Sequence, residues 1–185
     1  MWILIGAGGL FLLLIIIFFV IYNRLVSAKN VVHEAFSGID VQLKKRFELI
    51  PNLIEAVKGY NSHEADVLMK IAAYRGGVNP NVSEAASHDS SITAALKSFR
   101  ITVEDYPELK ANVQFLDLMK ELSEVEKELS MARRYYNGTV RDLNTKVEVF
   151  PNVMIAGMTG FKKAEFYELS SEAERQAPEV NLSEE

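Results

Sequence analysis

Apolar residues form two different patterns along the chain. From Trp2 to Asn23 nearly every residue is apolar, and the stretch contains no Asp, Glu, Lys or Arg. From Arg24 onward, large apolar residues recur at spacings of three, four and seven, which is the pattern of one face of a helix. The first pattern predicts a membrane-spanning helix, and the second predicts amphipathic helices that pack against one another.

The apolar N-terminal stretch has the length of a membrane span. At about 1.5 Å per residue, Trp2 and Tyr22 stand roughly 30 Å apart, which matches the hydrocarbon thickness of a bilayer and places an aromatic residue at each interface. A cleaved signal peptide has a basic start and a shorter apolar stretch, and this chain has neither. We therefore predict a transmembrane anchor over residues 1–23 that uses the lipid bilayer as its partner.

The flanking charges predict how the span is oriented. Lys and Arg residues follow the span, beginning with Arg24 and Lys29, and none precedes it. The positive-inside rule then places the N-terminus outside and the following domain in the cytoplasm.

The spacing of apolar residues predicts an all-α domain over residues 24–168. No Pro or Gly interrupts Leu10 to Ser37, so the span is expected to continue into the domain as one helix, which Pro51 ends or kinks. A second helix is predicted from Leu53 to Tyr74. The apolar stripe of the first helix consists of Leu25, Val32, Phe36, Ile39, Leu43, Phe47 and Ile50.

The second half of the chain is predicted to hold a loop, a short helix and the longest helix. Gly76 to Ser91 is rich in Gly, Asn and Ser, which predicts a mobile loop, and a short helix follows at Ile92–Phe99. Pro107 suits the first turn of a new helix, and the longest helix is expected from Glu108 to Phe150. Its stripe stays in phase across Gly138, so we expect that helix to tolerate the Gly at a cost of about 1 kcal/mol.

These elements predict an elongated antiparallel bundle of about four helices, attached to the transmembrane helix. The apolar segment Val153–Phe161 either closes the end of the bundle or forms a patch that contacts a partner or the membrane. Residues 169–185 are acidic and poor in large apolar side chains, so they are predicted to be a disordered tail.

Composition excludes most kinds of catalytic chemistry. The 185 residues include 20 Lys and Arg, 25 Asp and Glu, three His and no Cys, with a net charge of -5. The negative net charge argues against nucleic acid as a partner. The absence of Cys excludes disulfides and Cys-based metal sites. His63-Glu64 begins like a zinc-protease motif, but Val67 stands where the second His ligand is needed. The sequence therefore predicts no catalytic residue, no cofactor and no metal.

Three charged residues are expected to make polar contacts between helices. Glu64 lies in the middle of an apolar stripe, whereas Glu126 and Arg133 flank the stripe of the longest helix. A buried carboxylate needs a partner, so Glu64 is expected to pair with Arg133 or with Arg46, unless it reaches solvent at a helix end.

A second group of charges is a candidate surface for a partner. Lys44, Lys45 and Arg46 are consecutive bases that suit an acidic protein or lipid head groups. Along a straight helix Lys44 stands roughly 33 Å beyond Tyr22, which is too far for a screened membrane potential to act. These bases are left for a protein partner, a neighbouring subunit or solvation alone.

Taken together, the residues resemble the bacterial LemA family. The resemblance rests on the block VQLKKRFELIPNLIEAVKGY from Val41 to Tyr60, on Tyr106-Pro107-Glu108-Leu109, on Ala132-Arg133 with Tyr136-Asn137, and on Phe150-Pro151. It covers nearly the whole chain and is weakest from Gly76 to Ser91.

The resemblance implies an inner-membrane protein with one N-terminal span, a cytoplasmic helical bundle and no established enzymatic activity. We therefore expect a non-enzymatic scaffold or adaptor that forms homo-oligomers and binds a protein partner. A magnetosome-membrane protein is similar to this family, so the alternative is an oligomeric protein that remodels the membrane. An enzyme would need a polar pocket, for which Glu64, Glu126, Arg133 and Tyr136 are the only candidate group.

Overall fold

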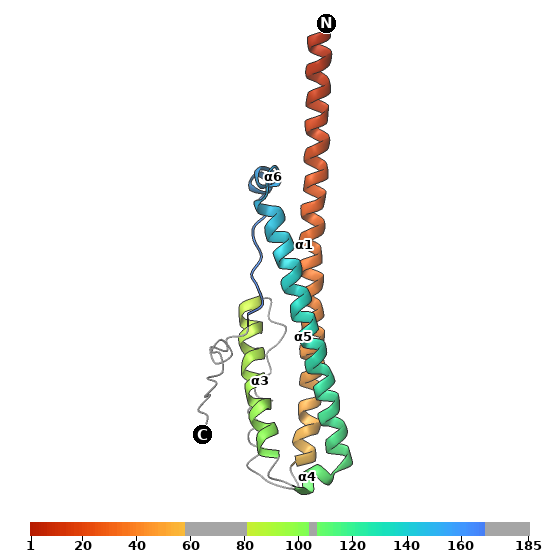
Figure 1. Cartoon of the computed structure of the whole chain (residues 1–185), viewed down its shortest axis with the longest axis vertical. Helices are drawn as coiled ribbons and strands as arrows, with labels where there is room; N and C mark the ends of the chain where they lie inside the picture. Colours follow the sequence, from red (N-terminus) through yellow and green to blue (C-terminus); the bar gives the residue numbers. More distant parts are fainter. Residues whose placement is uncertain (58–80, 104–106, 169–185) are drawn as a thin grey trace, which may run out of the picture. The chain divides into compact units, whose positions relative to one another are not determined.

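The computed structural model describes residues 1–57, 81–103 and 107–168 (Figure 1). The helices of this part of the chain are α1 (Trp2–Val57), α3 (Val82–Val103), α4 (Pro107–Ala111), α5 (Val113–Glu148) and α6 (Asn152–Thr159). Strands are absent from these residues, so the expected all-α helical bundle is confirmed. Most of the predicted helix Leu53–Tyr74 lies outside the described residues.

The chain forms two compact units. Unit 1 consists of Met1–Glu48 and Met119–Phe166, and unit 2 consists of Leu49–Leu118 and Tyr167–Glu185. Unit 1 contains most of α1, most of α5 and the whole of α6. Unit 2 contains α3 and α4.

In unit 1, α1 and α5 pack side by side in antiparallel directions. The ring of Phe36 lies 5.7 Å from the ring of Tyr136, and the guanidinium of Arg46 lies 3.0 Å from the carboxylate of Glu126. Moving ten residues forward along α1, from 36 to 46, thus corresponds to moving ten residues back along α5, from 136 to 126. This match fixes the register of the two helices.

Buried positions in both helices recur every seven residues, the spacing that keeps one side of a helix facing a neighbour over many turns. Each of these side chains is at most 8% exposed. In α1 the series is Leu25, Val32, Ile39 and Arg46; in α5 it is Leu122, Leu129, Tyr136 and Leu143. Arg46 is therefore a charged residue at a core position of α1.

In unit 2 the predicted mobile loop over Gly76–Ser91 is wrong from Val82 onward, because these residues form the first half of α3. Asn81 caps the helix by accepting a hydrogen bond from the Ser83 backbone N–H at 3.0 Å. The buried side of α3 includes Ala86, Asp89 and Ile92. One face of α3 is thus buried. The sequence did not predict it, because Ala86 and Asp89 stand where a buried helix face normally has large apolar residues.

Helix ends differ from the predictions at two places. Of the two alternatives for Pro51, an end or a kink, the end is wrong, because α1 continues to Val57. Asn112 divides the predicted helix Glu108–Phe150, because its side-chain oxygen accepts hydrogen bonds from the N–H groups of Gln114 and Phe115, 3.0 and 3.2 Å away, and so caps α5. As predicted, Pro107 begins a helix and α5 runs uninterrupted through Gly138.

Candidate functional site

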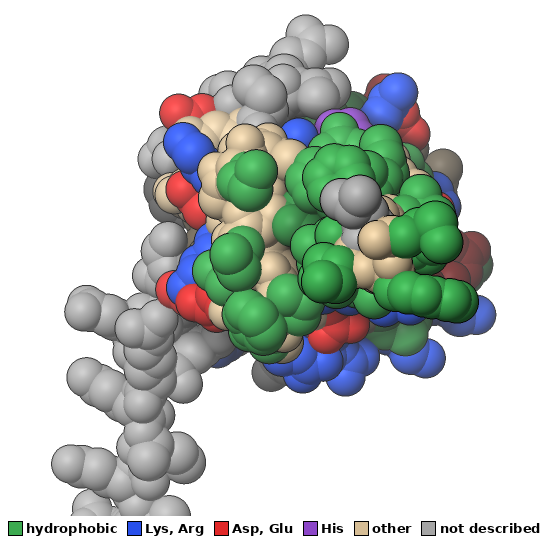
Figure 2. Space-filling model, turned by 90° about the horizontal axis from the view of Figure 1, so that it is seen from above, with side chains coloured by type: hydrophobic (Ala, Val, Ile, Leu, Met, Phe, Trp, Pro, Cys, Tyr) green, Lys and Arg blue, Asp and Glu red, His purple; other side chains and the backbone are tan. Residues whose placement is uncertain are grey.

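The first part of α1 is the one helix within the described residues that is long and apolar enough, by length and composition, to cross a membrane. Apolar side chains from Met1 to Tyr22 are largely exposed. A view onto the end of the molecule that carries the N-terminus shows hydrophobic side chains covering the helix (Figure 2). Apolar surface of this size is typical of a segment that contacts lipid.

Helix α6 packs against the last turns of this apolar stretch. Ile155 and Ala156 of α6 form a buried cluster with Ile21 and Leu25 of α1, and Phe18, Val147 and Phe161 pack against it. The helix follows Pro151 and ends at Gly160, whose φ of 76° is readily adopted only by Gly. One side of α6 thus closes this end of unit 1.

The opposite side of α6 is apolar and exposed. Met154 is 61% exposed, and Met158 and Phe150 are each 79% exposed. The predicted alternatives for Val153–Phe161 were closure of the bundle end and a contact patch, and the segment has a face suited to each.

Aromatic side chains surround the place where α6 meets α1. The ring of Tyr22 stacks on the ring of Phe18 at 6.4 Å and makes an edge contact with Phe161 at 5.9 Å. Trp2, the other residue predicted at a membrane interface, is exposed at the opposite end of the apolar stretch.

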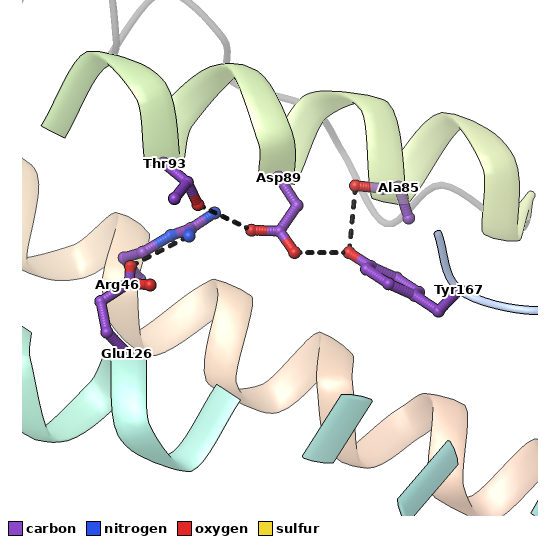
Figure 3. Close-up of polar contacts among 6 residues, drawn as sticks. All are labelled: Arg46, Ala85, Asp89, Thr93, Glu126 and Tyr167. Atoms are coloured by element: carbon purple, nitrogen blue, oxygen red, sulfur yellow. Dashed lines mark hydrogen bonds and ion pairs between the residues drawn. The ribbon is translucent and has the colours of Figure 1, made fainter. Parts of the chain in front are cut away.

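An ion pair joins α1 and α5 inside unit 1 (Figure 3). The side chain of Arg46 is 1% exposed and donates a hydrogen bond to Glu126, which is 25% exposed. Arg46 is therefore not available to the exposed basic surface that the sequence suggested, because its side chain is buried and its guanidinium binds Glu126. Lys44 and Lys45 are exposed.

The other two predicted contact residues have different outcomes. Arg133 is partly buried on α5. Glu64 lies outside the described residues, so its proposed pairing with Arg133 or Arg46 stays a prediction. The sequence did contain a signal for Arg46, because it continues the seven-residue series of Leu25, Val32 and Ile39.

A second polar cluster lies in unit 2 and was not predicted. The Tyr167 hydroxyl donates a hydrogen bond to the Asp89 carboxylate at 2.9 Å, and it lies 3.2 Å from the backbone oxygen of Ala85 (Figure 3). The hydroxyl of Thr93 lies 3.4 Å from Asp89 on the same helix. Asp89 and Tyr167 are both buried, so this cluster joins the C-terminal segment to α3.

The segment after α6 is held on α5 by two polar side chains. The amide of Asn144 donates to the backbone oxygen of Ala164 at 3.0 Å and accepts from the backbone N–H of Ala164 at 2.8 Å. The hydroxyl of Tyr136 donates to the backbone oxygen of Glu165 at 2.9 Å. Burial, with a smaller contribution from the charge of Glu165, raises the pKa of Tyr136 above 10.0.

Replacing Tyr136 by Phe is expected to lower the free energy of unfolding by about 1 kcal/mol near pH 8, because the hydrogen bond to Glu165 is lost. Since the folded-state pKa of Tyr136 is raised, the native phenol stabilises the fold below about pH 10, and that contribution disappears as the pH rises further. The difference between wild type and Tyr136→Phe should therefore shrink in alkaline solution. Denaturant unfolding in mild detergent at both pH values measures it.

The neighbouring substitution Tyr135→Phe is the matched control for this prediction. Tyr135 is 60% exposed, so its replacement should change stability by less than about 0.5 kcal/mol. A constant difference between wild type and Tyr136→Phe across the pH range would contradict the role assigned to the Tyr136 hydroxyl.

These clusters have the character of structural contacts. Among residues 1–57, 81–103 and 107–168, no group of three or more His, Asp or Glu side chains is placed to hold a metal ion. The polar groups described above bind one another or the backbone, and they join helices and the C-terminal segment.

Comparison with known proteins gives the family. The sequence model of the LemA family matches residues 35–182. The chain belongs to the LemA family. That family is not known for enzymatic activity, and its members are membrane-associated, which fits the apolar N-terminal half of α1.

Two kinds of curated relative are similar to this LemA-family chain. Protein LemA of Metamycoplasma hominis is 28% identical over 147 residues, which are 76% of this chain and 67% of the relative. Magnetosome proteins MamQ 1 and MamQ 2 of Paramagnetospirillum magneticum are each 21% identical over 175 residues, which are 80% of this chain and 64% of each relative. The chain thus spans about two thirds of the length of these relatives.

Proposed function

We propose that this LemA-family chain is a non-enzymatic scaffold of the bacterial inner membrane. It crosses the bilayer once, through residues 1–23, and presents its helices to proteins on the cytoplasmic side. It forms homo-oligomers and uses no cofactor or metal.

The continuity of α1 is the observation that carries this proposal. One helix extends from Trp2 to Val57, so no flexible joint separates the apolar stretch from the packed turns that begin at Ile21. A continuous helix resists bending, so a domain built on it is held in a defined orientation to the membrane. Such rigidity suits a protein that holds a partner in a fixed position. A segment that only tethers a mobile enzyme to the membrane does not need a rigid helix.

Lys44 and Lys45 are the candidate partner surface. They are exposed on α1, whereas the adjacent Arg46 is buried against Glu126. Two neighbouring exposed bases favour an acidic partner protein, and charge complementarity of this kind increases the rate of association.

Orientation is tested with single cysteines, because the native chain has none. We expect a cysteine inserted between Met1 and Trp2 to react with a membrane-impermeant maleimide in intact spheroplasts. The variant Lys44→Cys should react only after the membrane is permeabilised. The opposite labelling pattern would reverse the orientation, and labelling of both sites in intact cells would contradict the span.

The same Lys44→Cys variant, coupled to a photo-crosslinker, tests the partner surface. The proposal expects a crosslinked neighbour that disappears when Lys45→Glu is added. Lys127→Cys, an exposed site on α5, is the control. A neighbour captured equally well from both sites, or one that survives Lys45→Glu, would contradict a role for these bases.

Membrane remodelling is the second candidate function. It is favoured by similarity to two proteins whose names place them with magnetosomes, and by the exposed apolar face of α6 next to the span. Light scattering of the full-length protein in mild detergent separates the two functions. A large closed assembly supports remodelling, a small oligomer supports the scaffold, and a monomer contradicts self-assembly in both.

A further inference from the structure

The lobe formed by residues 149–161 has an unusual composition for a surface segment. It contains α6 and its two ends, and its sequence VFPNVMIAGMTGF has no charged residue. Val149, Phe150, Val153, Met154 and Met158 are all exposed apolar side chains. Soluble surfaces seldom collect this many large apolar groups on so short a segment unless something covers them.

The position of the lobe along α1 indicates what covers its exposed apolar side chains. Ile155 and Ala156 contact Ile21 and Leu25, so the lobe lies beside residues 18–25 of α1. With Trp2 at one boundary of a hydrocarbon core about 30 Å thick, a rise of about 1.5 Å per residue places Phe18 to Leu25 across the other boundary. The lobe is therefore at the depth of the membrane interface.

The view onto this end of the molecule agrees with that position. Figure 2 shows hydrophobic side chains of the lobe gathered next to those of α1, on the face from which the apolar stretch emerges. Continuity between the two apolar surfaces favours a single covering layer, and the layer that covers α1 here is lipid.

Charges begin immediately outside the lobe. Glu148 and Lys163 form an ion pair with each other at its two ends. Lys162 is exposed, and so is Arg24, which follows the span. Bases at this level are placed to meet the phosphates of lipid head groups, and the aromatic rings of Phe18, Tyr22 and Phe161 have the placement typical of a membrane interface.

We infer that the lobe of residues 149–161 inserts its exposed apolar face into the interfacial layer of the bilayer, beside the membrane-spanning part of α1. This inference rests on the single span proposed above. The chain then contacts the membrane at two points, which fixes how deeply unit 1 sits and how it is rotated about α1. The ligand is the lipid surface itself, with anionic head groups favoured by Lys162 and Arg24.

A tryptophan reporter tests this, because Trp2 is the one Trp of the chain. The full-length variant Trp2→Phe/Met158→Trp is reconstituted in phosphatidylcholine and phosphatidylglycerol vesicles whose acyl chains are brominated just below the head group. Met158 is 79% exposed, so the replacement should not disturb packing. We expect severalfold stronger quenching than for Trp2→Phe/Tyr135→Trp, whose reporter lies on an exposed part of α5. Phe150→Trp in the same background provides a second reporter.

The possible outcomes are distinct from those for the span. If the native Trp2 is quenched by brominated lipid but Trp at positions 158 and 150 is no more quenched than at 135, the lobe is not in the membrane and the single span stands. If Trp2 is not quenched either, the span itself fails. Reporters at 158 and 150 that are shielded from aqueous acrylamide yet unquenched by brominated lipid would show that protein, such as a second copy, covers the lobe, and would overturn the inference.

Discussion

Replacing Glu126 by Ala is expected to lower the free energy of unfolding by about 3 kcal/mol, because it removes the carboxylate that binds a buried guanidinium. Arg46 is 1% exposed, so its guanidinium cannot exchange this carboxylate for bulk water while the fold stays closed. Glu126 is partly solvated in the native protein, so the effect should be at the lower end of the range for broken buried pairs. Denaturant unfolding in mild detergent, followed by circular dichroism, measures it.

Two further variants separate the ion pair from the packing around it. Arg46→Met keeps the apolar stem and leaves behind a carboxylate that reaches solvent, so it should cost less than Glu126→Ala. The double variant Arg46→Met/Glu126→Leu should return to within about 1 kcal/mol of wild type or exceed it, because well-packed apolar replacements of buried ion pairs are often neutral or stabilising. Lys45→Ala, an exposed neighbour, is the control. A double variant that is less stable than Glu126→Ala would contradict this interpretation.

Replacing Tyr167 by Ala is expected to lower stability by about 3 to 4 kcal/mol, because a buried aromatic side chain is lost. Asp89 also loses the hydroxyl that binds its carboxylate at 2.9 Å. The effect should concentrate in unit 2, where this contact joins the C-terminal segment to α3. Hydrogen exchange of the α3 amides, together with denaturant unfolding, measures both the size and the location of the loss.

Phe166→Ala is the matched control, since Phe166 is the adjacent residue and is 44% exposed. It should change stability far less and leave exchange in α3 unaltered. The milder variant Tyr167→Phe should cost about 2 kcal/mol, the contribution expected of a hydrogen bond to a buried carboxylate. Equal losses for Tyr167→Ala and Phe166→Ala would show that the Asp89 cluster does not hold the segment.

Strongly periodic apolar segments were predictable, because helix packing imposes its period on the sequence. The predicted stripe of α1 includes Leu25, Val32, Ile39 and Ile50, and all four are buried, as the spacing requires. Prediction was wrong where a polar residue occupies a stripe position. The first half of α3 was missed because Asp89 holds a core position within a Ser-rich stretch. Arg46 was included in an exposed basic surface because it directly follows Lys44 and Lys45, although it was also a candidate partner for Glu64.

Helix ends depended on single residues that compete with apolar periodicity. Asn112 caps α5 through its side-chain oxygen, so the predicted longest helix is divided although its stripe continues. Pro51 has the opposite outcome, since α1 continues through it to Val57 although Pro lacks a backbone N–H. In both cases the sequence identified the residue that could end a helix. It did not show whether that residue or the packing of its neighbours would decide where the helix ends.

The sequence by itself determined the all-α fold, the apolar stretch of membrane-spanning length and the membership of the LemA family, because each depends on residue types at regular or characteristic spacings. Only the tertiary structure decided which charges are buried, which residue pairs with Arg46 and where α6 lies. These depend on contacts between residues far apart in the chain: Arg46 with Glu126, Asp89 with Tyr167, and Ile155 with Ile21. Such pairings depend on how packed helices are aligned with one another. The residue pattern along one helix does not specify that alignment.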